Sequence, residues 1–175
     1  MERALVFSVQ TKVLETVELT EHLTTLAPEK LLTWSPTAIP NSSAPTDLGH
    51  LLGHLLDCMA GFCAAFLAAF PDGLTDFAQL KALPVNQFCA PAEALARMNT
   101  YKVSIARGFA CCADADLSRK IKTIFAPEGE TLLTLLLGNL EHLINHKYQL
   151  FFYLKIAGIP VSSRELYKWH RALQS

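Results

Sequence analysis

The sequence predicts an all-α protein built as a four-helix bundle, and two observations support this. Four long apolar stretches alternate with segments rich in proline, glycine, serine and asparagine. No run of alternating apolar residues bounded by turn residues is strong enough to indicate a sheet. Four helices of roughly 20 to 27 residues fit one domain that spans the 175 residues of the chain, residues 1–175.

The first predicted helix runs from about Glu2 to Thr25, and the second runs to Phe70. The segment Ser35–Pro45 between them holds three prolines. It ends at Thr46-Asp47, and both residue types are favourable N-caps for the second helix. This segment is long enough for a crossover instead of a tight hairpin. We therefore expect a long first crossover loop.

The third and fourth helices are bounded by proline and glycine. Pro91 suits the first turn of the third helix, which weakens near Ala113–Asp116. Pro127–Gly129 introduces the fourth helix, and Gly158–Pro160 ends it, because glycine supplies a left-handed cap and proline cannot continue a helix. The tail Val161–Ser175 is amphipathic at best, and a short fifth helix there is an open option.

Composition excludes several classes of function. Half of the residues are apolar and the formal net charge is only −1, so no basic surface indicates nucleic-acid binding. The N-terminus lacks the pattern of a signal peptide. Leu48–Phe70 has the length of a membrane span, but His50, His54 and Asp57 would be costly in lipid, which favours a buried bundle helix. We expect a cytoplasmic protein with no membrane partner.

The five cysteines form no CxxC pair, so neither a thiolate zinc site nor a thioredoxin-type site is indicated. Most are expected to be apolar fillers, which fits a reducing cytosol. Cys111 and Cys112 are adjacent and point about 100° apart on a helix, which argues against a functional disulfide. Cys58 follows His54 by one turn and either approaches a metal there or fills the core.

Two histidines one helical turn apart, His142 and His146, are the most informative feature of the chain. Positions four apart lie within roughly 40° on one helical face, so one helix can offer both imidazoles to one metal ion. On a helical wheel they belong to a polar row between a leucine face and a solvent face, with members Leu135, Asn139, His142, His146, Gln149 and Tyr153. Such a row indicates either a polar pocket or a partly exposed flank.

The second helix carries another pair with the same spacing, His50 and His54. His54 lies about 40° from Cys58 on the apolar sector, whereas His50 is rotated further away. His54 is therefore the better candidate for a third ligand. His50 is expected near solvent or behind the ligands.

Three neutral imidazoles plus water would make an open site of the kind found in catalytic metal centres. Zinc, nickel and ferrous iron all accept such ligands, so the expected cofactor is a divalent ion of undefined identity. Asp57, Asn139 and Gln149 lie within helical reach and are expected, with His50, to orient the ligands. Hydrogen-bonded histidines that bind nothing would give the same pattern.

Four segments resemble the DinB/YfiT-like superfamily of bacterial metal-binding four-helix bundles, over nearly the whole chain. Leu48–Asp57 looks like the second-helix motif of that family, and Asp114–Arg119 resembles the acidic turn after its third helix. Asn139–Gln149 is similar to the fourth-helix motif, and Leu154–Pro160 to the segment that closes it. The resemblance implies a DinB-like bundle.

Carried over residue by residue, the three metal ligands of the family fall on His54, His142 and His146. The chain departs from the motif at Lys147-Tyr148, where the family usually has Arg-Gly. Lysine lacks the guanidinium fork. The tyrosine adds bulk on the outer face of the helix, where a homodimer contact is expected.

For activity the resemblance implies two possibilities and identifies no catalytic residue. One is a metal-dependent S-transferase that uses a low-molecular-weight thiol, or a hydrolase, acting on a small electrophilic substrate. The alternative is a non-catalytic bundle, tied by metal or metal-free, that acts as a dimeric interaction or stress module. Both assignments are by analogy with the family.

Overall fold

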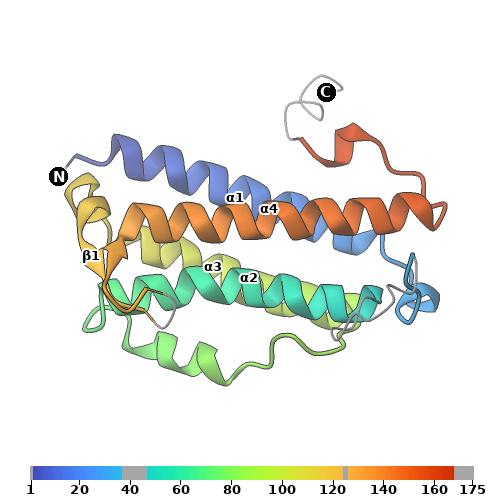
Figure 1. Ribbon diagram of the computed structural model, residues 1–175, viewed down its shortest axis with the longest axis horizontal. Helices are drawn as coiled ribbons and strands as arrows, with labels where there is room; N and C mark the ends of the chain where they lie inside the picture. Colours follow the sequence, from blue (N-terminus) through green and yellow to red (C-terminus); the bar gives the residue numbers. More distant parts are fainter. Residues whose placement is uncertain (1, 37–46, 124–125, 168–175) are drawn as a thin grey trace.

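The computed structural model describes residues 2–36, 47–123 and 126–167 of the chain. Four long helices dominate these residues, as Figure 1 shows. Their bounds are Ala4–Thr25 for α1, Leu48–Ala69 for α2, Pro91–Ala110 for α3 and Leu132–Ile156 for α4. The predicted all-α bundle is therefore confirmed.

Short elements connect these helices. The 3₁₀-helices are η1 (Glu29–Leu31), η2 (Thr75–Ala82), η3 (Asp114–Ser118) and η4 (Ser163–Glu165). Two-residue strands, β1 (Lys120–Ile121) and β2 (Glu130–Thr131), pair in antiparallel register with Lys120 opposite Thr131. Strands of this length have no room for an alternating pattern, so hydrophobic periodicity cannot predict them.

The helix order explains why two of the connections are long. Both α1 and α2 pack against α3 and α4, so α1 and α2 occupy opposite corners of the bundle. The backbone N–H of Cys89, just before α3, donates to the carbonyl of Gly49 at the start of α2. Both helices therefore start at the same end, and the segment with η2 must return along α2 (Figure 1).

The predicted first crossover loop connects the opposite corners, α1 and α2. Residues 37–46 of this loop lie outside the described residues, so its path stays a prediction. Its described ends meet, because the backbone N–H groups of Leu48 and Gly49 donate to the carbonyls of Trp34 and Leu32. The chain therefore enters α2 against the segment that follows α1.

Most predicted helix ends are confirmed. The side chain of Asp47 accepts a hydrogen bond from the backbone N–H of His50 and caps α2. Pro91 occupies the first turn of α3, and Gly158 adopts a φ of +82° after α4. In the tail, the described residues contain only η4; residues 168–175, including His170, lie outside them.

The α2 helix is the core element of the bundle. Its buried residues include Leu52, Leu55, Phe62 and Phe66, all with no exposed surface. Within the described residues it is the one helix long and apolar enough to cross a membrane, yet most of its most apolar window is buried against the other helices. Burial in the core of the bundle accounts for this composition.

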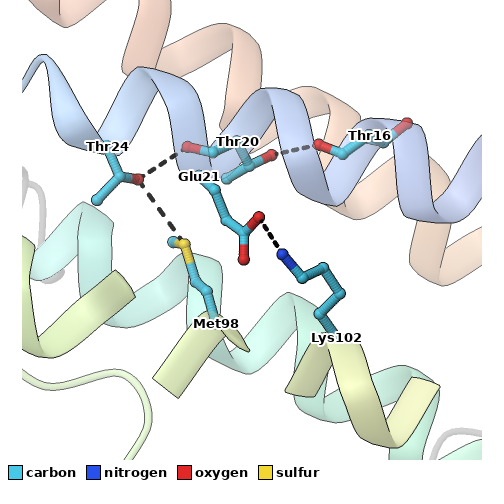
Figure 2. A network of polar contacts seen from close by, with 6 residues as sticks. All are labelled: Thr16, Thr20, Glu21, Thr24, Met98 and Lys102. Atoms are coloured by element: carbon cyan, nitrogen blue, oxygen red, sulfur yellow. Dashed lines mark hydrogen bonds and ion pairs between the residues drawn. The ribbon is translucent and has the colours of Figure 1, made fainter. Parts of the chain in front are cut away.

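A ladder of threonines runs along α1, and its last member contacts α3. Thr16, Thr20 and Thr24 are buried, and each hydroxyl donates to the carbonyl four residues earlier at 2.8 to 2.9 Å. Figure 2 shows Thr24 also reaching the sulfur of Met98, while Lys102 donates to Glu21 at 2.7 Å. Polar residues thus enter this interface with their hydrogen bonds satisfied locally.

The acidic turn after α3 joins the ends of three helices. The Asp114 carboxylate accepts from the backbone N–H groups of Leu5 and Val6 and caps α1. In return Arg3 donates to the carbonyls of Phe109 and Cys112 at the end of α3. Arg119 donates to the Ala69 carbonyl at the end of α2. The turn thereby fixes the end of the bundle opposite the histidines.

Candidate metal centre

The polar row predicted on α4 is present between its two other faces. Leu136, Leu140 and Leu143 are buried, and Glu141 and Asn145 are exposed. His142 and His146 are half-buried between them. A continuous helix therefore presents both imidazoles on one flank, as their spacing of four residues requires.

The third imidazole comes from α2, which runs antiparallel to α4. Nε2 of His54 lies 3.0 Å from Nε2 of His146 and 3.2 Å from Nε2 of His142. Ligands at about 2.0–2.1 Å from a tetrahedral zinc ion lie about 3.3 Å apart. Nε2 of His54 thus already stands at nearly this separation from Nε2 of each of the other two rings.

The partner of His146 fixes which ring nitrogen carries hydrogen. Nε2 of Gln149 donates to the hydroxyl of Tyr153 at 3.1 Å, so the amide oxygen of Gln149 faces the histidine. Nδ1 of His146 donates to this oxygen at 2.9 Å. In the neutral ring Nε2 then carries the lone pair.

His54 is held in the same way by a residue from another element. Nδ1 of His54 lies 2.5 Å from Oδ1 of Asn86, in the segment between η2 and α3. Asn86 has a positive φ of 57°, and its backbone N–H donates to the carbonyl of Gly53. A Cβ on Gly53 would lie 1.8 Å from the carbonyl oxygen of Gln87, so only glycine admits this segment.

These contacts make the histidine cluster suited to a cation. Because Asn86 and Gln149 accept from Nδ1, the Nε2 lone pairs of His54 and His146 point at each other across 3.0 Å. Two lone pairs at this separation repel unless a cation or a shared proton lies between them. A metal ion at the centre would bind all three lone pairs and relieve the repulsion.

Burial favours the ligand form of two of the rings. It lowers the pKa of His142, and the nearby His54 adds to this effect while Asp57 opposes it. Burial also lowers the pKa of His146, against the hydrogen bond to Gln149, with His54 and His142 lowering it further. Neutral imidazole is the form that binds metal, so both rings are available near neutral pH.

Cys58 is the fourth group of the cluster. One ligand atom from each of His54, Cys58, His142 and His146 lies within 4.8 Å of all the others. Cys58 is 1% exposed, and burial, aided by Asp57, raises the pKa of its thiol to about 12. Without a metal the sulfur therefore stays protonated, as expected for a core residue.

The other residues predicted near the ligands occupy different places. His50 pairs with Asp47 at 2.9 Å and packs edge-on against Phe88, away from the cluster. Asn139 donates to the Leu135 carbonyl and directs its oxygen at Gly61. Among the described residues these two make no hydrogen bond to the three rings.

Asp57 and Gln149 do act on the cluster. Asp57 works through its charge, which raises the pKa of His142, and makes no hydrogen bond to the three rings among the described residues. Gln149 accepts the hydrogen bond from His146. The set expected to orient the ligands thus contributes one direct partner.

Asn86 is the residue that sequence reasoning missed. It lies 32 residues after His54, in a segment with no helical periodicity to relate the two. The only available signals were local: asparagine tolerates positive φ, and α2 carries unusually placed glycines at 49 and 53. Small residues on a core helix mark the close approach of another segment.

The departure from the family motif at residues 147 and 148 has a visible consequence. Lys147 is only 7% exposed, and its ammonium donates to the Leu166 carbonyl at 3.1 Å. Burial lowers the pKa of this lysine. Tyr148 stays 44% exposed beside the exposed ring of Phe152. Lys147 therefore ties the C-terminal segment to α4, while Tyr148 enlarges an outer apolar surface.

Comparison with known proteins identifies the fold. No protein-family model and no curated sequence matches the chain. A DinB-like protein from Bacillus subtilis, YjoA, has a similar crystal structure at 2.30 Å resolution, with a TM-score of 0.61. The match covers 88% of this chain and 96% of YjoA, at 19% sequence identity. The chain therefore has a DinB-like fold, as the motifs predicted, and it carries a cluster that could hold a metal ion.

Proposed function

We propose that this protein binds one divalent metal ion through His54, His142 and His146. The observation that supports the proposal is the convergence of three Nε2 atoms, two of them at 3.0 and 3.2 Å from the third. Zinc, nickel and ferrous iron all accept imidazole ligands, so the proposal covers all three. A DinB-like fold agrees with such a site.

We further propose that the site is catalytic, in thiol S-transfer or hydrolysis on a small electrophilic substrate. Three protein ligands leave a coordination position open, and a bound divalent ion would lower the pKa of a thiol or water there. Gln149 and Asn86 would hold the rings rigid during this chemistry, because each binds the Nδ1 side of a ligand. The substrates would be a small electrophile and, for S-transfer, a low-molecular-weight thiol.

Cys58 favours a second candidate function. If its sulfur joined the three histidines, the ion would have four protein ligands and no open position, which is typical of structural sites. The protein would then be a non-catalytic module tied together by metal. The exposed side chains of Tyr148, Phe152 and Ile156 on α4 would offer a homodimer contact.

Cobalt spectroscopy separates these functions. Cobalt(II) titrated into metal-free protein should bind at one equivalent and give the visible bands of a four-coordinate ion. The catalytic proposal predicts no sulfur-to-cobalt charge-transfer band and an unchanged spectrum in Cys58→Ser. A charge-transfer band that disappears in Cys58→Ser would establish the closed site. No binding by either protein would overturn the metal proposal itself.

We also propose a cytoplasmic location. All five cysteines are free within the described residues, and four of them are buried. Free thiols persist in a reducing compartment. Fractionation of the native host followed by immunodetection would test this, and recovery in an oxidising compartment would contradict it.

A further inference from the structure

A groove beside the histidine cluster has no role in the metal site itself. It lies between α2 and α4 and encloses about 520 Å³. Its floor is made by small residues of α2, namely Gly61, Ala64, Ala65 and Ala68. Leu135 and Asn139 form the α4 wall, and Asn139 lies one turn before His142. The α4 wall of the groove therefore ends one helical turn from His142.

A second cavity adjoins the groove along α2. It encloses about 270 Å³ beneath η2 and the segment after it, with apolar walls that include Leu80, Leu83 and Val85. The two spaces share Gly61, Ala64 and Lys81. Together they have the size of a small-molecule site and are predominantly apolar.

Charged side chains give this space a polarity. Asp57 lines the cavity close to the histidines, one turn from His54. Lys81 and Lys122 line the groove, and neither pairs with a carboxylate among the described residues. The described ion pairs elsewhere occupy other lysines, such as Lys102 with Glu21. A molecule with one acidic end would be attracted to the lysines and repelled at the Asp57 end.

The spacing along α2 fits a molecule that spans both ends. Gly61 follows His54 by seven residues, or about 10 Å of helix. From Gly61 onward the α2 residues that line the groove are glycine and alanine, while Asp57 and Cys58 lie between Gly61 and His54. A molecule with its acid at the lysines would thus extend its opposite end along α2 in the direction of Asp57 and Asn139, the lining residues nearest to the three imidazoles.

We propose that this groove is the substrate-binding site of the metal centre and takes a small molecule with an apolar body and one acidic group. The acid, a carboxylate or a phosphate, binds Lys81 and Lys122, and the neutral end faces His54, His142 and His146. The role of the groove as a substrate site rests on the proposed function. Binding of the acid itself does not, because the lysines and the groove are independent of the metal.

Calorimetry on metal-free protein in the presence of chelator tests the groove. The probes are octanoate, octyl phosphate and the neutral alcohol octanol. Wild type should bind at least one acid more tightly than octanol, and Lys81→Met/Lys122→Met should weaken that binding about fivefold to tenfold. Lys30→Met, which removes an exposed lysine on η1, should bind like wild type. The tighter of the two acids identifies the substrate as a carboxylate or a phosphate.

A filling variant gives a second test that does not depend on charge. Ala64→Leu places a larger side chain where the two spaces meet and should abolish binding, whereas Ala96→Leu on the exposed face of α3 should not. Equal binding of octanol and the acids, no binding of any probe, or lysine variants that bind like wild type would each overturn the proposal.

Metal uptake by the same proteins separates this proposal from the function. Lys81→Met/Lys122→Met should take up cobalt like wild type, since neither lysine belongs to the histidine cluster. Acid binding without metal uptake would contradict the proposed function but support the groove as a binding site for acids. Metal uptake without acid binding would contradict the groove alone.

Discussion

The chain contains two histidine pairs of the same spacing, and the two pairs make different contacts. On α4, His142 and His146 point together at one centre, and His54 joins them from α2. On α2, His50 instead pairs with Asp47 at the helix start and packs against Phe88. Spacing alone therefore sets which face two residues share, while the neighbouring segment decides what each one meets.

The difference comes from what lies against each helix. Along α4 the polar row runs between a buried and an exposed face, so both rings are half-buried on the same flank. Along α2 the segment after η2 covers the outer face, and its Asn86 and Phe88 contact different histidines. His54 of α2 thus joins the cluster, whereas His50 pairs with Asp47 at the start of the helix.

The largest expected effect is on metal affinity and comes from replacing the histidines of α2. His54→Ala should lower metal affinity more than about 100-fold, because it removes one of three ligands. His50→Ala, its matched control, should change affinity less than about twofold, since its ring bonds Asp47. Competition titration against a chromophoric chelator measures both. Equal losses in the two variants would contradict the different roles.

The second largest effect on metal affinity should come from the residues that accept hydrogen bonds from the ligands. Asn86→Gly keeps the positive φ but removes the partner of His54 Nδ1, so metal affinity should fall about 10- to 100-fold. Gln149→Ala should lower metal affinity by a similar factor, because it removes the hydrogen-bond partner of His146. The same chelator competition applies, with circular dichroism to show intact helices. Wild-type affinity in Asn86→Gly would mean that the amide does not orient the ligand.

Two glycines sharpen the comparison of α2 with α4. An alanine Cβ at position 53 would lie 1.8 Å from the Gln87 carbonyl oxygen, whereas at Gly138 it would meet nothing within 4 Å. Gly53→Ala should therefore lower the free energy of unfolding by about 1–2 kcal/mol. Gly138→Ala should raise it by about 0.5–1 kcal/mol through helix propensity. Urea unfolding measures both, and stabilisation by Gly53→Ala would show that the segment does not pack on α2.

The smallest effect is on the pH dependence of the metal-free protein. The pKa values of His142 and His146 lie below 6.5 in the folded state. As the pH falls below about 6.5 the unfolded chain takes up protons first, so stability decreases until the folded rings also titrate. The Tm should thus drop more between pH 7.5 and 5.5 in wild type than in His142→Ala/His146→Ala. An equal drop would contradict the lowered pKa values.

The sequence was sufficient for those features that depend on one helix. The leucine face, the polar row of α4 and the choice of His54 over His50 all follow from a period of 3.6 residues. Helix ends followed from Asp47, Pro91 and Gly158, whose side-chain or backbone chemistry is local.

Features that join distant segments were not predictable in this way. The contact of Asn86 with His54 depends on the path of an irregular segment, and the diversion of His50 depends on the same path. Asn139 lies on the predicted row but faces Gly61, because α2 has no side chain there. The lysines of the groove come from η2 and from the residue after β1, which no periodicity relates.

The central claim is that the three histidines bind one metal ion, and elemental analysis tests it most directly. Wild type and His142→Ala/His146→Ala would be purified without chelator from metal-supplemented cells and compared for helicity. The account predicts about one divalent ion per chain in wild type and none in the equally helical variant. A wild-type protein without metal, even after reconstitution with zinc, nickel or ferrous iron, would contradict it.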